Sequence, residues 1–107
     1  MNANQTSSHA VHEHLKLAAE AIGLGPGEIQ ERVVEAARHL LRIRGGEDQM
    51  PDRLREPFES ILRDLAGDPT AAAGSIDLAR IRHMGFYDAA KIAGHILRLE
   101  KTSQRRG

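Results

Sequence analysis

Residues 26–46 read PGEIQERVVEAARHLLRIRGG, and no other stretch of this chain indicates its fold class so clearly. Its apolar residues recur every three or four positions, which is the spacing of one face of an α-helix. This face comprises Ile29, Val33, Ala36, Ala37, Leu40 and Leu41. Proline suits the first position of a helix, and glycine commonly ends one. We therefore predict a helix over residues 26–44 that starts at Pro26 and ends before Gly45 and Gly46.

The same apolar spacing continues on both sides of this helix. It predicts a first helix over residues 10–22, a third over 51–65, a short one over 76–84 capped by Ser75, and a last one over 86–101. The apolar stripe of the last helix is Phe86, Ala89, Ile92, Ala93, Ile96 and Leu99. Pro57 removes a hydrogen bond from the third helix, so either this helix bends there or residues 51–56 form a separate turn.

Length and composition predict one folded domain. The chain has 107 residues, of which 40% are hydrophobic and 28% charged, a balance typical of folded rather than disordered proteins. Leu, Ala, Glu and Arg favour helices, and no strand-like alternation of useful length occurs. We therefore predict an all-α fold: a four- to five-helix irregular or antiparallel bundle over residues 1–107, with residues 1–7 and 102–107 as frayed tails.

The chain contains no cysteine, which excludes disulfides and thiolate metal sites within it. The first residues are polar and lack the basic start and apolar stretch of a secretory signal. No apolar run approaches the length that crosses a bilayer. These features predict a cytoplasmic protein without a membrane partner.

The net charge is zero, but the charges are unevenly distributed. Residues 46–75 hold seven acidic and three basic residues, whereas residues 76–107 hold seven basic and three acidic ones. The simplest interpretation is that an acidic third helix packs near a basic C-terminal segment, within a monomer or across a dimer. A charged external partner is the alternative.

Six histidines are the first residues to consider for chemistry. His9 and His12 are three positions apart, so both could reach one metal ion on a helix, although no metal site is predicted from this pair alone. His39 and His95 lie at the edges of apolar stripes. An enzyme would need a pocket that joins His39, His83 or His95 with a carboxylate, and the candidates are Glu35, Glu59 and Asp88. No phosphate-binding loop, dinucleotide fingerprint, nucleophile elbow or zinc-protease motif occurs, so we predict no catalytic residue and no cofactor.

Residues 76–99 also fit a helix-turn-helix. A short helix, a glycine at position 85 and a following helix provide the change of direction that this motif needs. Its candidate phosphate contacts are Arg80, Arg82, Lys91, Arg98 and Lys101. Three features count against DNA binding: the apolar positions after the glycine are displaced, few side chains suit base edges, and the overall charge is neutral.

The leading hypothesis is a small interaction or regulatory protein that acts through contacts of its helix faces, without catalysis. The apolar faces around Leu40 and Leu99 are wider than one small bundle covers, which predicts a homodimer or a contact with another protein. The candidate partner-contact residues are Leu41, Ile43, Tyr87 and Leu97. DNA binding through residues 76–101, and an enzyme or metal-binding protein that uses its histidines, are the alternatives.

Overall fold

The computed structural model describes residues 8–43, 50–67 and 76–104. These residues form five helices and no strand: α1 (Ser8–Leu24), α2 (Ile29–Leu41), α3 (Asp52–Ala66), α4 (Leu78–Arg82) and α5 (Phe86–Gln104). The prediction of an all-α bundle with four to five helices is therefore confirmed.

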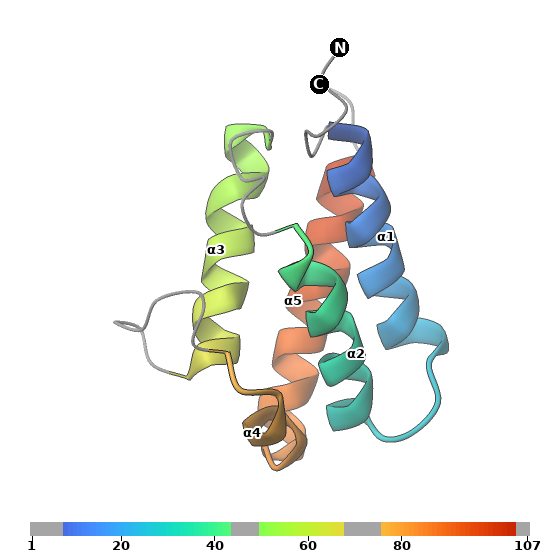
Figure 1. Cartoon of the computed structure of the whole chain (residues 1–107), viewed down its shortest axis with the longest axis vertical. Helices are drawn as coiled ribbons and strands as arrows, with labels where there is room; N and C mark the ends of the chain where they lie inside the picture. The colour runs from blue at the N-terminus through green and yellow to red at the C-terminus, as the bar shows by residue number, and fades with distance from the viewer. Residues whose placement is uncertain (1–7, 44–49, 68–75, 105–107) are drawn as a thin grey trace.

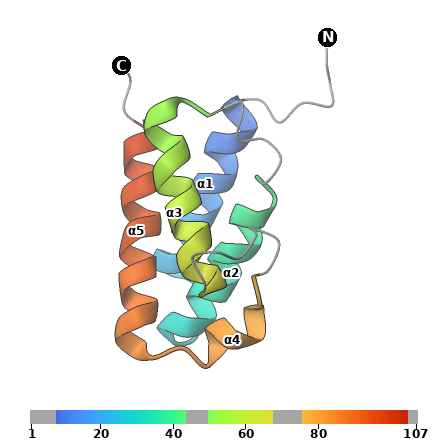
Figure 2. The ribbon, with the colours of Figure 1, turned by 90° about the vertical axis from the view of Figure 1, so that its left-hand side faces the viewer.

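The four long helices alternate in direction, and the short α4 lies at one end of the bundle (Figure 1). Helix α5 packs against α1, α2 and α3, whereas α4 packs against α2. Seen from the side, α5 forms one edge of the molecule, with α3 beside it and α1 behind (Figure 2). One side of α5 therefore belongs to the core and the other faces solvent.

The core is aliphatic and combines the apolar stripes of all five helices. The expected stripe of α3 is buried in full: Leu54, Phe58, Ile61, Leu62 and Leu65. On α5, Ala89, Ile92, Ala93, Ile96 and Leu99 are buried as expected. Phe86 is the exception: it is 61% exposed because it falls at the border of the stripe in the first turn of α5. Within the described residues, no helix has both the length and the apolar content needed to cross a membrane.

The start of α2 differs from the prediction. The helix begins at Ile29 rather than at Pro26, and Glu28 is extended with φ −77° and ψ 170°. Gly27 has a φ of +88°, a left-handed conformation that interrupts any helix running through it. Residues 25–28 are therefore the connection between α1 and α2, and the guanidinium of Arg32 closes it by donating to the carbonyls of Gly27 (3.1 Å) and Ile22 (3.3 Å). The helix ends at Leu41, with Arg42 as its C-terminal cap, rather than at residue 44, and Gly45 and Gly46 lie outside the described residues.

Of the two alternatives at Pro57, the structure excludes the separate turn, because α3 runs through this residue as one helix. The end of α5 differs from the prediction. Helix α5 extends to Gln104, so residues 102–104 are helical instead of frayed. Ser103 explains this extension, because its Oγ donates to the Glu100 carbonyl (2.7 Å) and lies 3.2 Å from Nδ1 of His12 on α1. The expected tail residues 1–7 and 105–107 lie outside the described part of the chain.

Candidate interaction surface

The corner between α4 and α5 is fixed by a local cap and by two contacts with the rest of the bundle. Asp77 caps α4 by accepting a hydrogen bond from the Ala79 amide (3.0 Å), so the cap comes two residues after the expected Ser75, which lies outside the described residues. Ile81 is fully buried and anchors α4 in the core. Gln30 on α2 donates to the Met84 carbonyl (3.0 Å) in the turn before α5. These contacts fix the direction in which α5 leaves the corner.

Arg80, the first predicted phosphate contact, is bound to the protein's own backbone. Its guanidinium donates to the carbonyls of Leu65 (2.6 Å) and Asp64 (3.3 Å) at the last turn of α3. Helix α3 ends there at Gly67, whose φ of +80° is a left-handed cap and where an added Cβ would stand 2.7 Å from Cζ of the same guanidinium. A cation at a helix C-terminus satisfies free carbonyls and opposes the negative end of the helix dipole. Arg80 thus closes α3.

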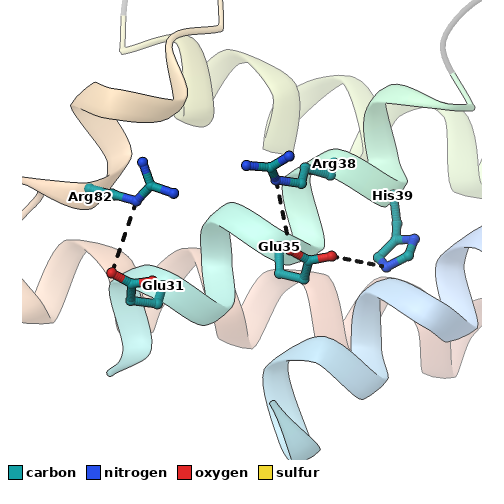
Figure 3. Close-up of polar contacts among 5 residues, drawn as sticks. All are labelled: Glu31, Glu35, Arg38, His39 and Arg82. Atoms are coloured by element: carbon teal, nitrogen blue, oxygen red, sulfur yellow. Dashed lines mark ion pairs between the residues drawn. The ribbon is translucent and has the colours of Figure 1, made fainter. Parts of the chain in front are cut away.

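Arg82, the second candidate, also points back onto the bundle. Its Nε lies 3.9 Å from Oε2 of Glu31 on α2 (Figure 3). Both side chains are about half exposed, so this ion pair is screened by solvent. The helix-turn-helix hypothesis therefore loses two of its five proposed phosphate contacts to intramolecular ones.

The other three candidates lie together on the solvent side of α5. Lys91, Arg98 and Lys101 are all exposed, and their spacing of seven and three residues places them on one helix face. The two acidic residues of α5 lie off this face. Asp88 borders the face at Lys91, because the two residues line one depression together with Asp64 and Arg80, and half-buried Glu100 bonds to Gln104.

Large apolar side chains share this face with the cations. Within the described residues, three of the five exposed large hydrophobic side chains are on α5: Phe86 (61%), Tyr87 (85%) and Leu97 (41%). The rings of Phe86 and Tyr87 pack edge to face with centroids 5.5 Å apart. Monomeric proteins seldom gather exposed aromatic and aliphatic side chains without a use for them.

Small residues flatten the middle of the same face. Ala90 is half-buried, and Gly94 is exposed with no atom within 4 Å of the place where a Cβ would stand. Glycine costs a helix interior about 1 kcal/mol relative to alanine, and nothing inside the described bundle requires it here. We call the following residues the outer face of α5: Phe86, Tyr87, Ala90, Lys91, Gly94, Leu97, Arg98 and Lys101.

The partner-contact candidates from the sequence divide into three groups. Tyr87 and Leu97 belong to the outer face of α5, and Leu41 is half-buried. Ile43 is wrong as a contact residue, because it is fully buried in the core of the monomer. Leu40 and Leu99 are buried as well, so the monomer covers most of the apolar surface that suggested a homodimer, and the dimer itself stays a prediction. The sequence reasoning missed Phe86 and Gly94, although an aromatic residue beside Tyr87 and a mid-helix glycine were visible signals.

The histidines of the enzyme hypothesis lie in different parts of the bundle. Nε2 of His39 is 3.9 Å from Oε2 of Glu35 on α2, and Glu35 also pairs with Arg38 (3.7 Å; Figure 3). Nδ1 of His95 on α5 is 3.8 Å from Oδ2 of Asp64. His83 is exposed at the end of α4. His95 lines the groove between α3 and α5, and neither His39 nor His83 is among the residues that line it.

Burial governs the chemistry of His39. Desolvation lowers its pKa below the ordinary value, the carboxylate of Glu35 opposes this, and the nearby Arg42 and His14 lower the pKa further. The Nδ1 atoms of His14 and His39 are buried and make no hydrogen bond within the described residues. A histidine held neutral in this way fits packing between α1 and α2.

The candidate metal ligands do not form a cluster in the described residues. Nδ1 of His12 is occupied by Ser103, and the side chain of His9 lies outside the described part. No group of three or more histidine, aspartate or glutamate side chains converges as a metal site there.

Comparison with known proteins adds no family assignment, since the chain matches no protein-family model, and neither a curated protein nor a solved structure matches it significantly.

Proposed function

We propose that this chain is a non-enzymatic interaction protein whose outer face of α5 binds an acidic amphipathic helix of a partner protein. One observation carries the proposal: Tyr87 and Leu97 are exposed on the same helix face as three cations, and Asp88 borders this face at Lys91. A partner helix with an apolar stripe flanked by Asp and Glu would match both features. Helices commonly bind helices in this way, through apolar anchors at helical spacing.

The small residues at the centre of this face support a helical partner. Two helices pack at about 8–10 Å between axes, and the shorter distances require small side chains at the contact. Ala90 and Gly94 stand one turn apart, between the aromatic pair and Leu97. A partner helix could therefore approach closely in the middle while its apolar side chains contact Tyr87 on one side and Leu97 on the other.

A protein partner is favoured over nucleic acid because the arginines of α4 are already bound to other parts of the bundle. Arg80 and Arg82 are engaged with α3 and α2, so the cations left for phosphates are those of α5. The exposed side chain of Leu97 belongs to the same outer face of α5 as these cations, and an apolar group there has nothing to gain from a phosphate backbone. A second copy is less suitable as the occupant, because two outer faces of α5 would bring like charges together.

The test uses three labelled peptides in fluorescence anisotropy titrations of the full chain. One peptide is helical, with leucines at helical spacing and glutamates beside them; the second replaces the glutamates with lysines; the third scrambles the first. We expect the acidic amphipathic peptide alone to bind, and its affinity to fall as salt is raised. Tighter binding of a duplex oligonucleotide, or concentration-dependent dimerisation without peptide binding, would refute the proposal in favour of DNA or a second copy.

Leucine variants provide a matched control. Leu97→Ala should weaken peptide binding about tenfold, which is about 1.4 kcal/mol. Leu17 on α1 is exposed to nearly the same extent as Leu97, at 37% against 41%, but lies on another helix. Leu17→Ala should leave binding unchanged, and equal losses in the two variants would contradict the assignment of the surface.

Alanine variants of two glycines distinguish an effect on stability from an effect on binding. Gly23 on α1 and Gly94 on α5 both have open space where a Cβ would stand. Either glycine replaced by alanine should stabilise the fold by about 0.5–1 kcal/mol in urea unfolding. Gly94→Ala should in addition weaken the acidic peptide, whereas Gly23→Ala should not; unchanged peptide affinity for Gly94→Ala would exclude close approach of the partner at this point.

A further inference from the structure

A groove of about 310 Å³ separates the first half of α3 from the last half of α5. These two helices lie next to each other with opposite directions (Figure 2). Pockets that hold small molecules are typically about 300–1,000 Å³, so this groove is large enough for a small ligand. It is distinct from the outer face of α5, with which it shares Arg98.

The polar side of the groove is positively charged. Arg53 comes from the α3 wall and Arg98 from the α5 wall, and no carboxylate is among the described residues that line the groove. His95 and Ser60 add further groups able to donate hydrogen bonds. Each guanidinium group carries a positive charge that attracts an anion entering the groove. Arginine forks are suited to carboxylates, which they bind through two parallel hydrogen bonds.

The other side of the groove is apolar. Ile61 and Leu99 are each 2% exposed and form its floor, and Pro57 completes the wall on α3. The proline lacks the N–H that a helix interior normally uses, yet α3 runs through it with the ring on the exposed side. An apolar floor below paired cations can bury the body of a ligand while the cations hold its charged end.

We infer that this groove binds a small organic carboxylate with an aliphatic or aromatic body. The carboxylate lies between Arg53 and Arg98, and the body lies on Ile61, Leu99 and Pro57. An inorganic anion would contact only the two arginines, and an uncharged amphiphile would contact only the apolar floor. Both parts are needed for the affinity that this site provides, and the assignment does not depend on the partner of the outer face of α5.

The probes are sodium octanoate, octanol and inorganic phosphate, each titrated into the full chain and followed by two-dimensional amide NMR. Octanoate should shift the amide signals around Ser60, His95 and Arg98 and should bind about tenfold more tightly than octanol or phosphate. If octanoate leaves these signals unmoved, or if phosphate or octanol binds equally well, the inference is wrong.

Variants on the two walls give the decisive comparison. Arg53→Gln and Arg98→Gln should each weaken octanoate about tenfold, and Ser60→Phe should abolish binding by filling the groove while both arginines remain. Arg63→Gln is the control, because Arg63 is an exposed arginine of α3 outside the groove lining. Circular dichroism checks that each variant folds. If Ser60→Phe does not fold, the comparison of Arg53→Gln and Arg98→Gln with the control Arg63→Gln decides the test. If Arg63→Gln and Arg53→Gln lose the same affinity for octanoate, the binding reflects the general positive charge of the protein and the inference of a site in this groove is wrong.

Discussion

Arg80 and Arg82 on α4 point back onto the bundle, whereas Lys91, Arg98 and Lys101 on α5 are exposed to solvent. All five come from the same basic stretch of sequence. The α4 arginines lie beside the end of one helix and the acidic side of another, and they bind these groups. The α5 cations stand on a helix whose opposite side already fills the core. A count of basic residues therefore does not tell which of them are available to a partner.

Short and long helices differ here for a physical reason. The five residues of α4 hold one buried anchor, Ile81, so the polar residues around it lie close to neighbouring helix ends and bind them. The 19 residues of α5 bury five apolar side chains along one side, which leaves the opposite side free over several turns. Arg32 repeats the role of Arg80, since its guanidinium also binds the end of a preceding helix, at the carbonyl of Ile22.

The largest expected effect comes from releasing α4. Ile81→Ala removes the fully buried anchor and should destabilise the fold by about 2–5 kcal/mol, measured by urea unfolding. Leu97→Ala, on the exposed side of α5, should cost less than about 1 kcal/mol. Similar costs for the two variants would mean that α4 is not held by this side chain and that its arginines are not fixed in place.

A smaller effect should distinguish the two groups of cations directly. Arg80→Gln loses charge-assisted hydrogen bonds to the carbonyls of Leu65 and Asp64 and should destabilise by about 1–2 kcal/mol, because the site is partly open to solvent. Arg98→Gln should change the free energy of unfolding by less than about 0.5 kcal/mol. If Arg98→Gln lowers the free energy of unfolding as much as Arg80→Gln does, the proposed difference between the α4 and α5 cations is wrong.

The smallest expected effect is a change of stability with pH that comes from the partly buried His39. Because burial lowers the pKa of folded His39, the unfolded chain takes up its proton first as the pH falls. Stability from this group is present above its ordinary pKa of 6.5 and is lost as the pH falls from there through the lowered folded value. Unfolding free energies measured from pH 8 to pH 5 should show this loss.

Two variants assign that pH dependence to His39. Glutamine does not titrate, so His39→Gln should remove the contribution of this residue to the pH dependence of the free energy of unfolding. Glu35→Gln removes the carboxylate that raises the pKa of His39, so the histidine should resist protonation more strongly and the loss should extend to lower pH. An unchanged slope in His39→Gln would show that other groups account for the pH dependence.

Apolar spacing predicted the helices and nearly all of the core. Phe58, Ile61 and Leu62 on α3 are buried as their spacing required, and so are Ile92 and Ile96 on α5. Such positions are predictable because a helix has a fixed period and water excludes apolar side chains from the surface. The boundaries were less predictable, since Pro26 and Gly27 serve the turn before α2 rather than its first turn.

The candidate site was predictable only in part. Tyr87, Leu97 and the three α5 cations were named from the sequence, but so were Arg80 and Ile43, which the fold uses internally. The α3–α5 groove could not be anticipated, because Arg53 and Arg98 are far apart in sequence and line one groove only after the helices have packed. Neighbours of this kind depend on which helices lie side by side.

The sequence by itself determined that this chain forms helices, and which side of each helix avoids water, because both follow from local spacing and transfer from water. Tertiary packing alone decided which charged groups meet. The length and docking of α4 brought Arg80 to the end of α3, and the antiparallel contact of α3 with α5 placed Arg53 and Arg98 along one groove. Electrostatic contacts depend on distances between elements, and those distances exist only after the helices have packed.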